Sequence, residues 1–413
     1  MKIYITILLC LLSNSSMAQV KTGIEVLREH NFKELAGQRV GLITNPTGVD
    51  GQLKSTIDIL NSPQARQAGV RLTALFAPEH GVRGDVAAGV KFDHVRDESS
   101  SAMIYSLYGN GMKPQKEMLQ DVDVLVFDIQ DIGSRSYTFI STLGLAMEAA
   151  AQNGKKFMVL DRPNPLGGVK VEGEVVQSGF SSFVSKYPVP YIHGMTIGEL
   201  ARCYSAEKML SGGVECNLVV IPMQGWTRQM EWKDTALPWV PTSPHIPHAQ
   251  STIYYPVSGM AGELQTINIG VGYTLPFELF AAEWITDAQT LCSMLNANNI
   301  PGVIFRPIHL TPFYGSAKGK AIHGVQVHVT DLQKAPLTLL QFYVFQELHL
   351  LYPDHSPLEQ ATNERIEMFD KVMGSSTLRT AFIKGNYRVA AIKSLWESGA
   401  KSFLTIRDKY LLY

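Results

Sequence analysis

Short apolar runs alternate with helical patterns along the first half of the chain. The runs are almost continuously hydrophobic, as strands buried on both faces of a parallel sheet require. They are Val40–Thr44, Leu72–Ala77, Val122–Phe127, Phe157–Leu160 and Leu218–Ile221. Helical patterns lie between them at Ser55–Leu60, Thr142–Gln152 and Thr196–Arg202. This alternation predicts an α/β domain, a Rossmann-like doubly wound parallel sheet, over residues 19–225.

The second half of the chain has a different pattern. Residues 226–262 contain Trp226, Trp232, Trp239 and several prolines, which predicts a long ordered connecting loop of the kind that often carries function. Residues 263–413 predict a second, smaller α+β domain. Its expected helices are Pro276–Trp284, Asp287–Asn296 and Leu337–Leu351, its expected strands are Val303–Leu310 and Gly324–Thr330, and its tail is helix-rich from Ser375.

Residues 1–18 have the layout of a secretory signal peptide. Lys2 is the only charge before Lys21, an apolar run follows it, and the small residues Ser16 and Ala18 precede the expected cleavage site. The apolar run is too short for a permanent membrane span. A buried N-terminal strand is the alternative. We therefore expect a periplasmic or secreted protein that begins near Gln19.

Composition narrows the function classes. The chain has 36 Lys+Arg and 37 Asp+Glu, a formal charge of −1, so the basic surface that nucleic acid requires is absent. The hydrophobic and charged fractions, 45% and 18%, are those of a globular protein. Beyond residue 18 the cysteines are Cys203, Cys216 and Cys292. Buried free thiols are expected, with a Cys203–Cys216 bridge as the alternative in an oxidising compartment.

Polar side chains cluster where the predicted strands end. The carboxyl ends of parallel strands share one edge, and open α/β sheets bind ligands there. One such cluster alone is typical of a solvated turn, but four on one edge predict a binding or catalytic site. The clustered residues are Asn45, then Glu79 and His80, then Asp128, Asp131, Arg135 and Tyr137, and finally Asp161, Arg162 and Asn164.

Glu79 is the strongest catalytic candidate. Pro78 stiffens the strand exit and Gly81 permits a tight reversal, so the backbone at Glu79 is fixed. Arg83 lies four residues further on and could orient or deprotonate the carboxyl group. The alternative is a carboxylate that merely stabilises a helix N-terminus.

Other chemistries fit the sequence less well. Gly109–Gly111 and Gly270–Gly272 each lack the third glycine of a dinucleotide fingerprint. The chain has no Walker A lysine loop, no Gly-x-Ser-x-Gly elbow and no His-Glu-x-x-His. The spacing of His245 and His248 indicates a metal site only weakly, and structural or substrate-contact roles are expected for them. We expect neither a cofactor nor a metal ion.

Eight stretches occur in the order found in a known family. They are Gly41–Gly48, Phe76–Gly84, Phe127–Thr138, Leu160–Gly168, Val171–Gly173, His193–Leu200, Pro241–Pro247 and Asn268–Gly272. In these the chain resembles, from about Gly23 to Tyr413, the exo-acting β-N-acetylmuramidases of peptidoglycan recycling, glycoside hydrolase family 171. It departs from the family at Tyr273, where a small residue is more usual.

The resemblance implies a Rossmann-like domain, a smaller C-terminal domain and an active-site cleft between them. It also implies release of terminal N-acetylmuramic acid (MurNAc) from the non-reducing end of peptidoglycan fragments, with Glu79 as the catalytic carboxylate. The substrates would be muropeptides or saccharides of MurNAc and N-acetylglucosamine (GlcNAc). Glu263 is a candidate second carboxylate. If the substrate's own 2-acetamido group acts as nucleophile, Asp128 could orient it.

The remaining candidates are assigned to substrate binding. The planar fork of arginine suits the lactyl carboxylate of MurNAc, and we rank Arg83 before Arg162 and Arg135. The three tryptophans could form a sugar-stacking wall, with core packing as the alternative. The other expected binding residues are Asn45, His80, Asp131, Tyr137, Asp161, Asn164, His245 and Asn268.

Two other functions compete with the muramidase. The first is a non-catalytic binding protein for cell-wall sugar acids, which needs the arginines but not Glu79. The second, less favoured, is an esterase or amidase that acts on wall fragments.

Overall fold

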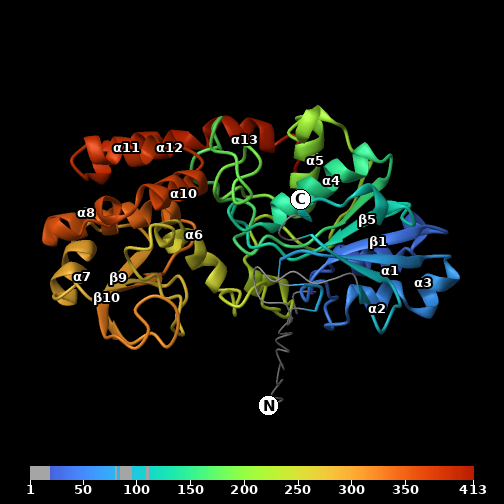
Figure 1. Cartoon of the computed structure of the whole chain (residues 1–413), viewed down its shortest axis with the longest axis horizontal. Coiled ribbons are helices and arrows are strands. Elements are labelled where there is room, and N and C mark those ends of the chain that lie inside the picture. Colours follow the sequence, from blue (N-terminus) through green and yellow to red (C-terminus); the bar gives the residue numbers. More distant parts are fainter. Residues whose placement is uncertain (1–18, 80, 84–94, 108–110) are drawn as a thin grey trace, which may run out of the picture.

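The computed structural model describes residues 19–79, 81–83, 95–107 and 111–413, and Figure 1 shows it as two lobes. In the described part of the larger lobe, the sheet has the order β3-β4-β2-β1-β5-β6-β7. Only β3 is antiparallel to its neighbour. The strands are β1 (Arg39–Thr44), β2 (Arg71–Ala77), β3 (Val95–Arg96), β4 (Met103–Ser106), β5 (Val124–Asp128), β6 (Lys156–Leu160) and β7 (Leu218–Ile221).

The order of the six parallel strands confirms the Rossmann-like fold. From β1 the sheet is built outward first through β2 and β4, then on the other side through β5, β6 and β7. The point where the order reverses, beside β1 and β5, is where such sheets open a ligand crevice. Glu79 lies two residues beyond the end of the adjacent strand β2.

Helices cover both faces of this sheet, which explains the continuous apolar runs. In β5, Val126 faces one hydrophobic core and Phe127 faces the other. The first core is shared with α1 (Gly23–Glu29), α2 (Thr56–Leu60) and α3 (Pro63–Gln67), and the second with α4 (Phe139–Gln152) and α5 (Ile197–Ala206). Helix α5 opens with a capping box formed by Thr196 and Glu199.

The smaller lobe has an antiparallel sheet, whose described strands run in the order β8-β10-β9. Its elements are α6 (Ser251–Gly262), β8 (Leu279–Ala282), α7 (Ala288–Ala297), β9 (Val303–Leu310), β10 (Ile322–Val329), α8 (Leu340–Leu351), α9 (Pro357–Gln360), α10 (Asn363–Met373), α11 (Thr377–Lys384), α12 (Lys393–Gly399) and α13 (Lys401–Arg407). The second α+β unit is thus confirmed. The helix expected at Pro276–Trp284 is wrong, because β8 occupies its centre and is buried along its whole length.

The expected loop at residues 226–262 is only partly a loop. Residues 251–262 form helix α6, which contains Pro256, a residue that normally interrupts a helix. Trp226 is buried against Tyr413, with ring centroids 5.1 Å apart. Trp232 and Trp239 pack edge-on at 4.8 Å. For Trp226, burial supports the packing role and not the sugar wall.

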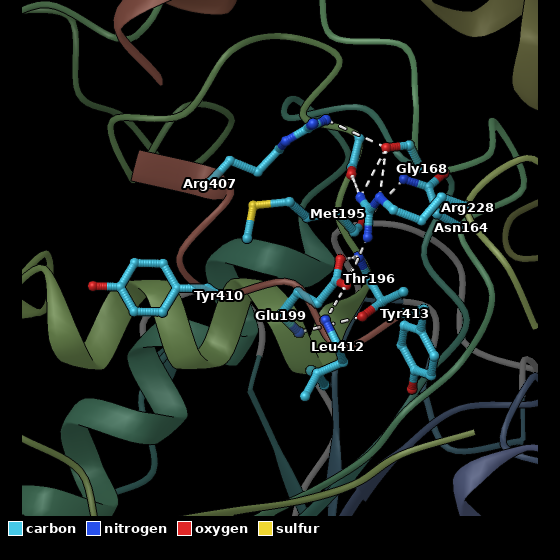
Figure 2. A network of polar contacts seen from close by, with 12 residues as sticks. Asn164, Gly168, Met195, Thr196, Glu199, Arg228, Arg407, Tyr410, Leu412 and Tyr413 are labelled. Carbon is cyan, nitrogen blue, oxygen red and sulfur yellow. Dashed lines mark hydrogen bonds and ion pairs between the residues drawn. The ribbon is translucent and has the colours of Figure 1, made fainter. Parts of the chain in front are cut away.

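The C-terminal tail returns to the larger lobe (Figure 1), and Figure 2 shows how it is held. The Tyr413 hydroxyl donates to the Asp161 carboxylate at 2.8 Å, and the Leu412 N–H donates to Glu199 Oε1 at 2.8 Å. The Arg228 guanidinium pairs with the same Glu199 carboxylate at 2.7 Å. Residues from the end of the chain therefore complete the N-terminal lobe.

The cysteines that the structure describes are free thiols, as expected from the sequence. Burial raises the pKa of the Cys203 and Cys216 thiols to about 12, so both stay protonated and unreactive. Within the described ranges, no helix combines the length and apolar character needed to cross a membrane.

Candidate active site

Glu79 lines a cavity of about 210 Å³ between the two lobes. The larger lobe contributes the start of α4 and the residues just before it, while Ser243 comes from the connecting segment and Tyr255 from α6. The Glu79 side chain is half-buried, and its Oε2 accepts a hydrogen bond from Thr138 Oγ1 at 3.2 Å. A carboxyl group held by the exit of β2 thus faces a space that both lobes enclose.

A chain of hydroxyl groups leads into this cavity. Ser136 Oγ lies 2.7 Å from the Tyr191 hydroxyl and donates to the Tyr255 hydroxyl at 3.2 Å. The ring of Tyr137 meets that of Tyr255 edge-on, with centroids 5.7 Å apart. Burial raises the pKa of Tyr255, and nearby carboxylates including that of Glu79 raise it further. The phenol therefore stays protonated at neutral pH and can donate a hydrogen bond.

Asp131 is buried behind the cavity rather than exposed on its rim. Its Oδ2 accepts the Gly133 N–H at 2.7 Å and lies 3.9 Å from His193 Nε2. Burial raises the pKa of Asp131 to about 7 and lowers that of His193 to about 3. The carboxyl group therefore fixes the turn that leads to Ser136 and Tyr137. Asp131 was expected to bind substrate, but it is bonded within its own turn instead.

Two of the three arginines expected to bind the lactyl carboxylate are interior. Arg135 has no exposed surface, and its guanidinium donates to the carbonyl oxygens of Glu174, Val189 and Val372 at 2.6–2.8 Å. Burial lowers its pKa to about 10, so it stays charged at neutral pH. Arg135 was expected to bind the lactyl carboxylate, but its buried guanidinium does not face a ligand in this conformation.

Arg162 and Arg83 each form an ion pair with a carboxylate of the chain. The buried Arg162 donates to Asp128 Oδ1 at 2.5 Å and to the Val49 carbonyl oxygen at 2.7 Å. Arg83 is more exposed, and its guanidinium pairs with Asp97 at 2.8 Å. Burial alone would raise the pKa of Asp97, but the bonds from its neighbours, Arg83 among them, hold it well below its usual value. These arginines stabilise loops of the sheet edge.

Asp128 and Asp161 are likewise structural. Asp128 has no exposed surface and accepts hydrogen bonds from Thr56 and an arginine, so it does not reach a substrate acetamido group in this conformation. Asp161 accepts the Gly198 N–H at 2.8 Å and the Thr196 hydroxyl at 2.7 Å, which holds the start of α5. Burial raises the pKa of Asp161 to about 6 despite these bonds.

The three expected asparagines shape loops. Asn45, Asn164 and Asn268 each accept, through the side-chain oxygen, the backbone N–H two residues later, at 3.0, 3.0 and 2.7 Å. Such turns explain why asparagine stands at these positions. After Asn268, a Cβ at Gly272 would lie 2.1 Å from the Tyr314 carbonyl oxygen, and its φ of +101° also favours glycine.

Glu263 and His245 are the remaining candidates whose positions the structure describes. Glu263 caps the C-terminus of α6 and is half-buried; burial raises its pKa, while the charge of Arg365 lowers it. Glu263 is not among the described residues that line the Glu79 cavity. His245 Nε2 lies 2.8 Å from the Tyr314 hydroxyl. His80 lies outside the described residues.

A larger hollow of about 600 Å³ offers less suitable chemistry. Its carboxylates belong to Glu231, paired with Lys233 at 2.9 Å, and Asp331, paired with Lys334 at 2.8 Å. A carboxylate held by a lysine is a poor proton donor. Among the residues with described positions, no cluster of three or more His, Cys, Asp or Glu could hold a metal ion.

Sequence reasoning missed five of the seven described residues that line the cavity, namely Ser136, Thr138, Phe139, Ser243 and Tyr255. Tyr255 stands in a stretch read as a loop, since Pro256 conceals the helix. Thr138 and Ser243 are small hydroxyl residues that look like ordinary turn residues. The available signal was that Thr138 and Ser243 both fall inside the family-like stretches Phe127–Thr138 and Pro241–Pro247.

Comparison with known proteins agrees with this geometry. The chain is 43% identical over 395 residues to the peptidoglycan β-N-acetylmuramidase NamZ of Bacillus subtilis, covering 96% of this chain and 92% of that protein. Two crystal structures of DUF1343 family proteins from Bacteroides fragilis superpose with TM-scores of 0.90 and 0.75, at 53% and 28% identity, each covering 96% of this chain and 99% of the other.

Family models match nearly the whole described chain. The model for the N-terminal part of exo-β-N-acetylmuramidase NamZ matches residues 40–250, and the model for its C-terminal part matches residues 253–413. The two matches meet just before Tyr255, so the Glu79 cavity is built from both parts. The chain therefore belongs to the exo-β-N-acetylmuramidase NamZ family.

Proposed function

We propose that this protein is a glycosidase that releases terminal MurNAc from the non-reducing end of peptidoglycan fragments. The observation that carries the proposal is Glu79, a half-buried carboxyl group in a cavity between two lobes. A glycosidic oxygen must gain a proton as its bond breaks, and a positioned carboxylic acid supplies it. The name of the Bacillus subtilis relative supports the choice of sugar.

The groups around Glu79 suggest how the reaction proceeds. Thr138 donates to one carboxyl oxygen of Glu79, which leaves the other free to face the glycosidic bond. The protonated Tyr255 hydroxyl, contributed to the cavity by α6, is a second donor. Glu79 is the only carboxylate among the described residues that line the cavity. We therefore infer that the 2-acetamido group of the substrate acts as the nucleophile, a known exception to the two-carboxylate mechanism.

A matched pair of chromogenic β-glycosides, one of MurNAc and one of GlcNAc, tests the proposed function. Cleavage of the MurNAc glycoside at a rate at least ten times that of the GlcNAc glycoside is expected, since the lactyl carboxylate adds charged hydrogen bonds of about 1.5–3 kcal/mol. Equal rates on the two glycosides would contradict specificity for MurNAc. A thiazoline analogue of MurNAc should inhibit competitively. Absence of inhibition would contradict the role of the 2-acetamido group as nucleophile.

The structure removes two of the groups that the competing binding function was expected to use. Arg135 and Arg162 are buried and bonded within the chain, so they do not present a guanidinium to a sugar acid. Such a binder has no use for Glu79 in the cavity, so binding of wall saccharides without any turnover by the wild-type protein would favour it.

We also propose that the protein is exported to the periplasm or secreted. The support is the signal-like layout of residues 1–18, with Lys2, an apolar run and Ala18. Intact-mass analysis of the protein from a periplasmic or culture fraction should show a chain that begins near Gln19. Soluble cytosolic protein that retains Met1 would contradict export.

A further inference from the structure

A second cavity, of about 340 Å³, lies along helix α4 from the Glu79 cavity. Thr138, which lines the first cavity, and Leu145, which lines the second, are seven residues apart and therefore on the same face of the helix, about 10 Å apart along its axis. Leu145 is the partly exposed residue in a helical stretch that is otherwise buried. The polar and aromatic lining consists of Lys113, Gln115, Ser181, Ser182, Phe183 and Lys186.

The wall of this second cavity is anchored at several points. Ser182 and Ser185 exchange two backbone hydrogen bonds, at 3.3 and 3.1 Å, which closes a tight turn. The Ser141 hydroxyl of α4 donates to the Phe183 carbonyl oxygen at 2.7 Å. Arg135 donates to the Ser185 hydroxyl at 3.3 Å. The buried arginine thus helps to hold a wall of the second cavity instead of binding a ligand itself.

The charges in this cavity favour an anion. The Lys113 ammonium is paired with the buried Glu148 carboxylate at 3.2 Å. Lys186 forms no ion pair with any residue in the described ranges, so its charge is uncompensated there. The Ser182 hydroxyl is shielded from solvent and has no hydrogen-bond partner in the described part of the chain. The uncompensated ammonium suits a carboxylate, and the Ser182 hydroxyl could join it only after a rotation of its side chain toward the cavity.

We propose that the second cavity is an outer subsite for the lactyl carboxylate of a second MurNAc on the leaving part of the wall fragment. This rests on the proposed function, which places the scissile bond at Glu79. The Phe183 ring and the Leu145 side chain provide apolar surface for the sugar that carries the carboxylate. The separation along α4 puts this group beyond the terminal MurNAc that is released.

Kinetics on a short and a long substrate test the subsite. The short one is the chromogenic MurNAc glycoside, and the long one is a tetrasaccharide with MurNAc at its non-reducing end and a second, carboxylate-bearing MurNAc further on. Lys186→Ala should raise KM for the long substrate about tenfold, because it removes a hydrogen bond to a charged group. KM for the short substrate should change less than twofold. Lys186→Gln, which keeps N–H donors without charge, should restore only part of the loss.

A matched control and a binding measurement keep the result decisive. Lys116→Ala, at an exposed lysine near Lys113, should leave both substrates unchanged. An unchanged KM for the long substrate in Lys186→Ala, or an equal loss on both substrates, would overturn the subsite. If the wild-type protein turns over neither substrate, the proposed function is wrong. Calorimetry then still tests the subsite, by comparing the affinity for the tetrasaccharide with that for its carboxamide analogue. Equal affinity for the two would overturn the subsite.

Discussion

Glu79 and Asp131 are two acidic side chains of the same region with different surroundings. Glu79 is half-buried and faces a cavity, whereas Asp131 is buried and is bonded to the backbone of its own turn. Neither environment could be read from the sequence, because both residues follow apolar strands in similar polar stretches. The first is suited to proton transfer with a substrate and the second to fixing the backbone.

Glu79→Gln should reduce turnover of the MurNAc glycoside by about 10²–10⁴-fold, the usual contribution of general acid–base catalysis. The amide keeps the size of the side chain but cannot supply the proton. Steady-state kinetics measures the loss, and an unchanged far-UV spectrum and melting temperature show that the fold is intact. Glu117→Gln, at an exposed carboxylate, is the control and should retain full activity. A loss smaller than tenfold in Glu79→Gln would exclude Glu79 as the catalytic acid.

Asp131→Asn should flatten the pH dependence of stability. The ordinary pKa of this carboxyl group is 3.8, so it is ionised in the unfolded chain above about pH 4, whereas in the folded protein its pKa of about 7 keeps it protonated up to neutral pH. The free energy of unfolding therefore falls as the pH rises from about 4 to about 7. The difference corresponds to roughly 4 kcal/mol. The pKa of Asp161 is raised to about 6, so this residue adds a pH dependence of the same sign. The variant is therefore compared with wild type, because both proteins contain Asp161.

Urea unfolding at pH 5 and pH 8 measures this effect. Wild type should lose roughly 2–3 kcal/mol more than Asp131→Asn between the two pH values, because asparagine can still accept the Gly133 N–H but does not ionise. Asp354→Asn, at an exposed position, should follow wild type. Identical pH profiles for wild type and Asp131→Asn would show that the buried carboxyl group does not titrate in this range.

At the scale of elements, Arg135 joins parts of the chain that are distant in sequence. Its guanidinium is bonded to the carbonyl oxygens of Glu174 and Val189 in the N-terminal lobe and of Val372 near the end of α10. A long polar side chain therefore fixes the loop before α4 to a helix of the other lobe. Its position beside Tyr137 made a role in the site plausible from sequence, but its burial required the fold.

Arg135→Met should destabilise the protein by at least about 3 kcal/mol. Methionine fills similar space but leaves the buried carbonyl oxygens of Glu174 and Val189 without their donor, each costing about 1–3 kcal/mol, and leaves that of Val372 with only the 3.4 Å bond from the Ser185 hydroxyl. Chemical denaturation measures the change, with Arg71→Met, at an exposed arginine of β2, as the control expected to stay within about 0.5 kcal/mol. A loss below 1 kcal/mol in Arg135→Met would mean that these bonds contribute little.

The elements that could be predicted from the sequence are those with a clear period. Strands β1, β2, β5, β6 and β7 and the start of α5 follow from apolar runs and a capping box, whereas β3 and β4 were not predicted. Strand β8 and helix α6 could not be predicted, because four consecutive buried residues fit either a strand or a helix and because Pro256 argues against the helix it occupies. The lining of the active site depended on α6, so its Tyr255 was missed.

At the scale of the whole molecule, the last residues of the chain complete the lobe formed by its first half. The C-terminal residues pack on the N-terminal lobe, where Tyr413 contacts Trp226 and donates to Asp161, and where Leu412 is bonded to Glu199 (Figure 2). The chain thus passes between the lobes once through the segment before α6 and again after α12 (Figure 1). Two crossings restrain the lobes more than one, which favours a fixed cavity at their junction.

Deletion of Leu412 and Tyr413 should lower the stability of the whole protein in a single cooperative transition. Tyr413→Phe is the matched variant: it keeps the edge contact with Trp226 and loses only the hydrogen bonds of the hydroxyl, about 1–3 kcal/mol. The deletion should cost more than this substitution. Tryptophan fluorescence and circular dichroism during denaturation measure both, and an unchanged midpoint for the deletion would show that the tail is not part of the folded lobe.

The most direct test of the central claim is the product of a defined glycan. A tetrasaccharide with MurNAc at its non-reducing end is incubated with wild-type protein and with Glu79→Gln, and the products are followed by mass spectrometry. We predict that wild type releases single MurNAc units and leaves a trisaccharide, while Glu79→Gln leaves the glycan intact. Internal disaccharide products, or equal release by Glu79→Gln, would contradict an exo-acting muramidase that depends on Glu79.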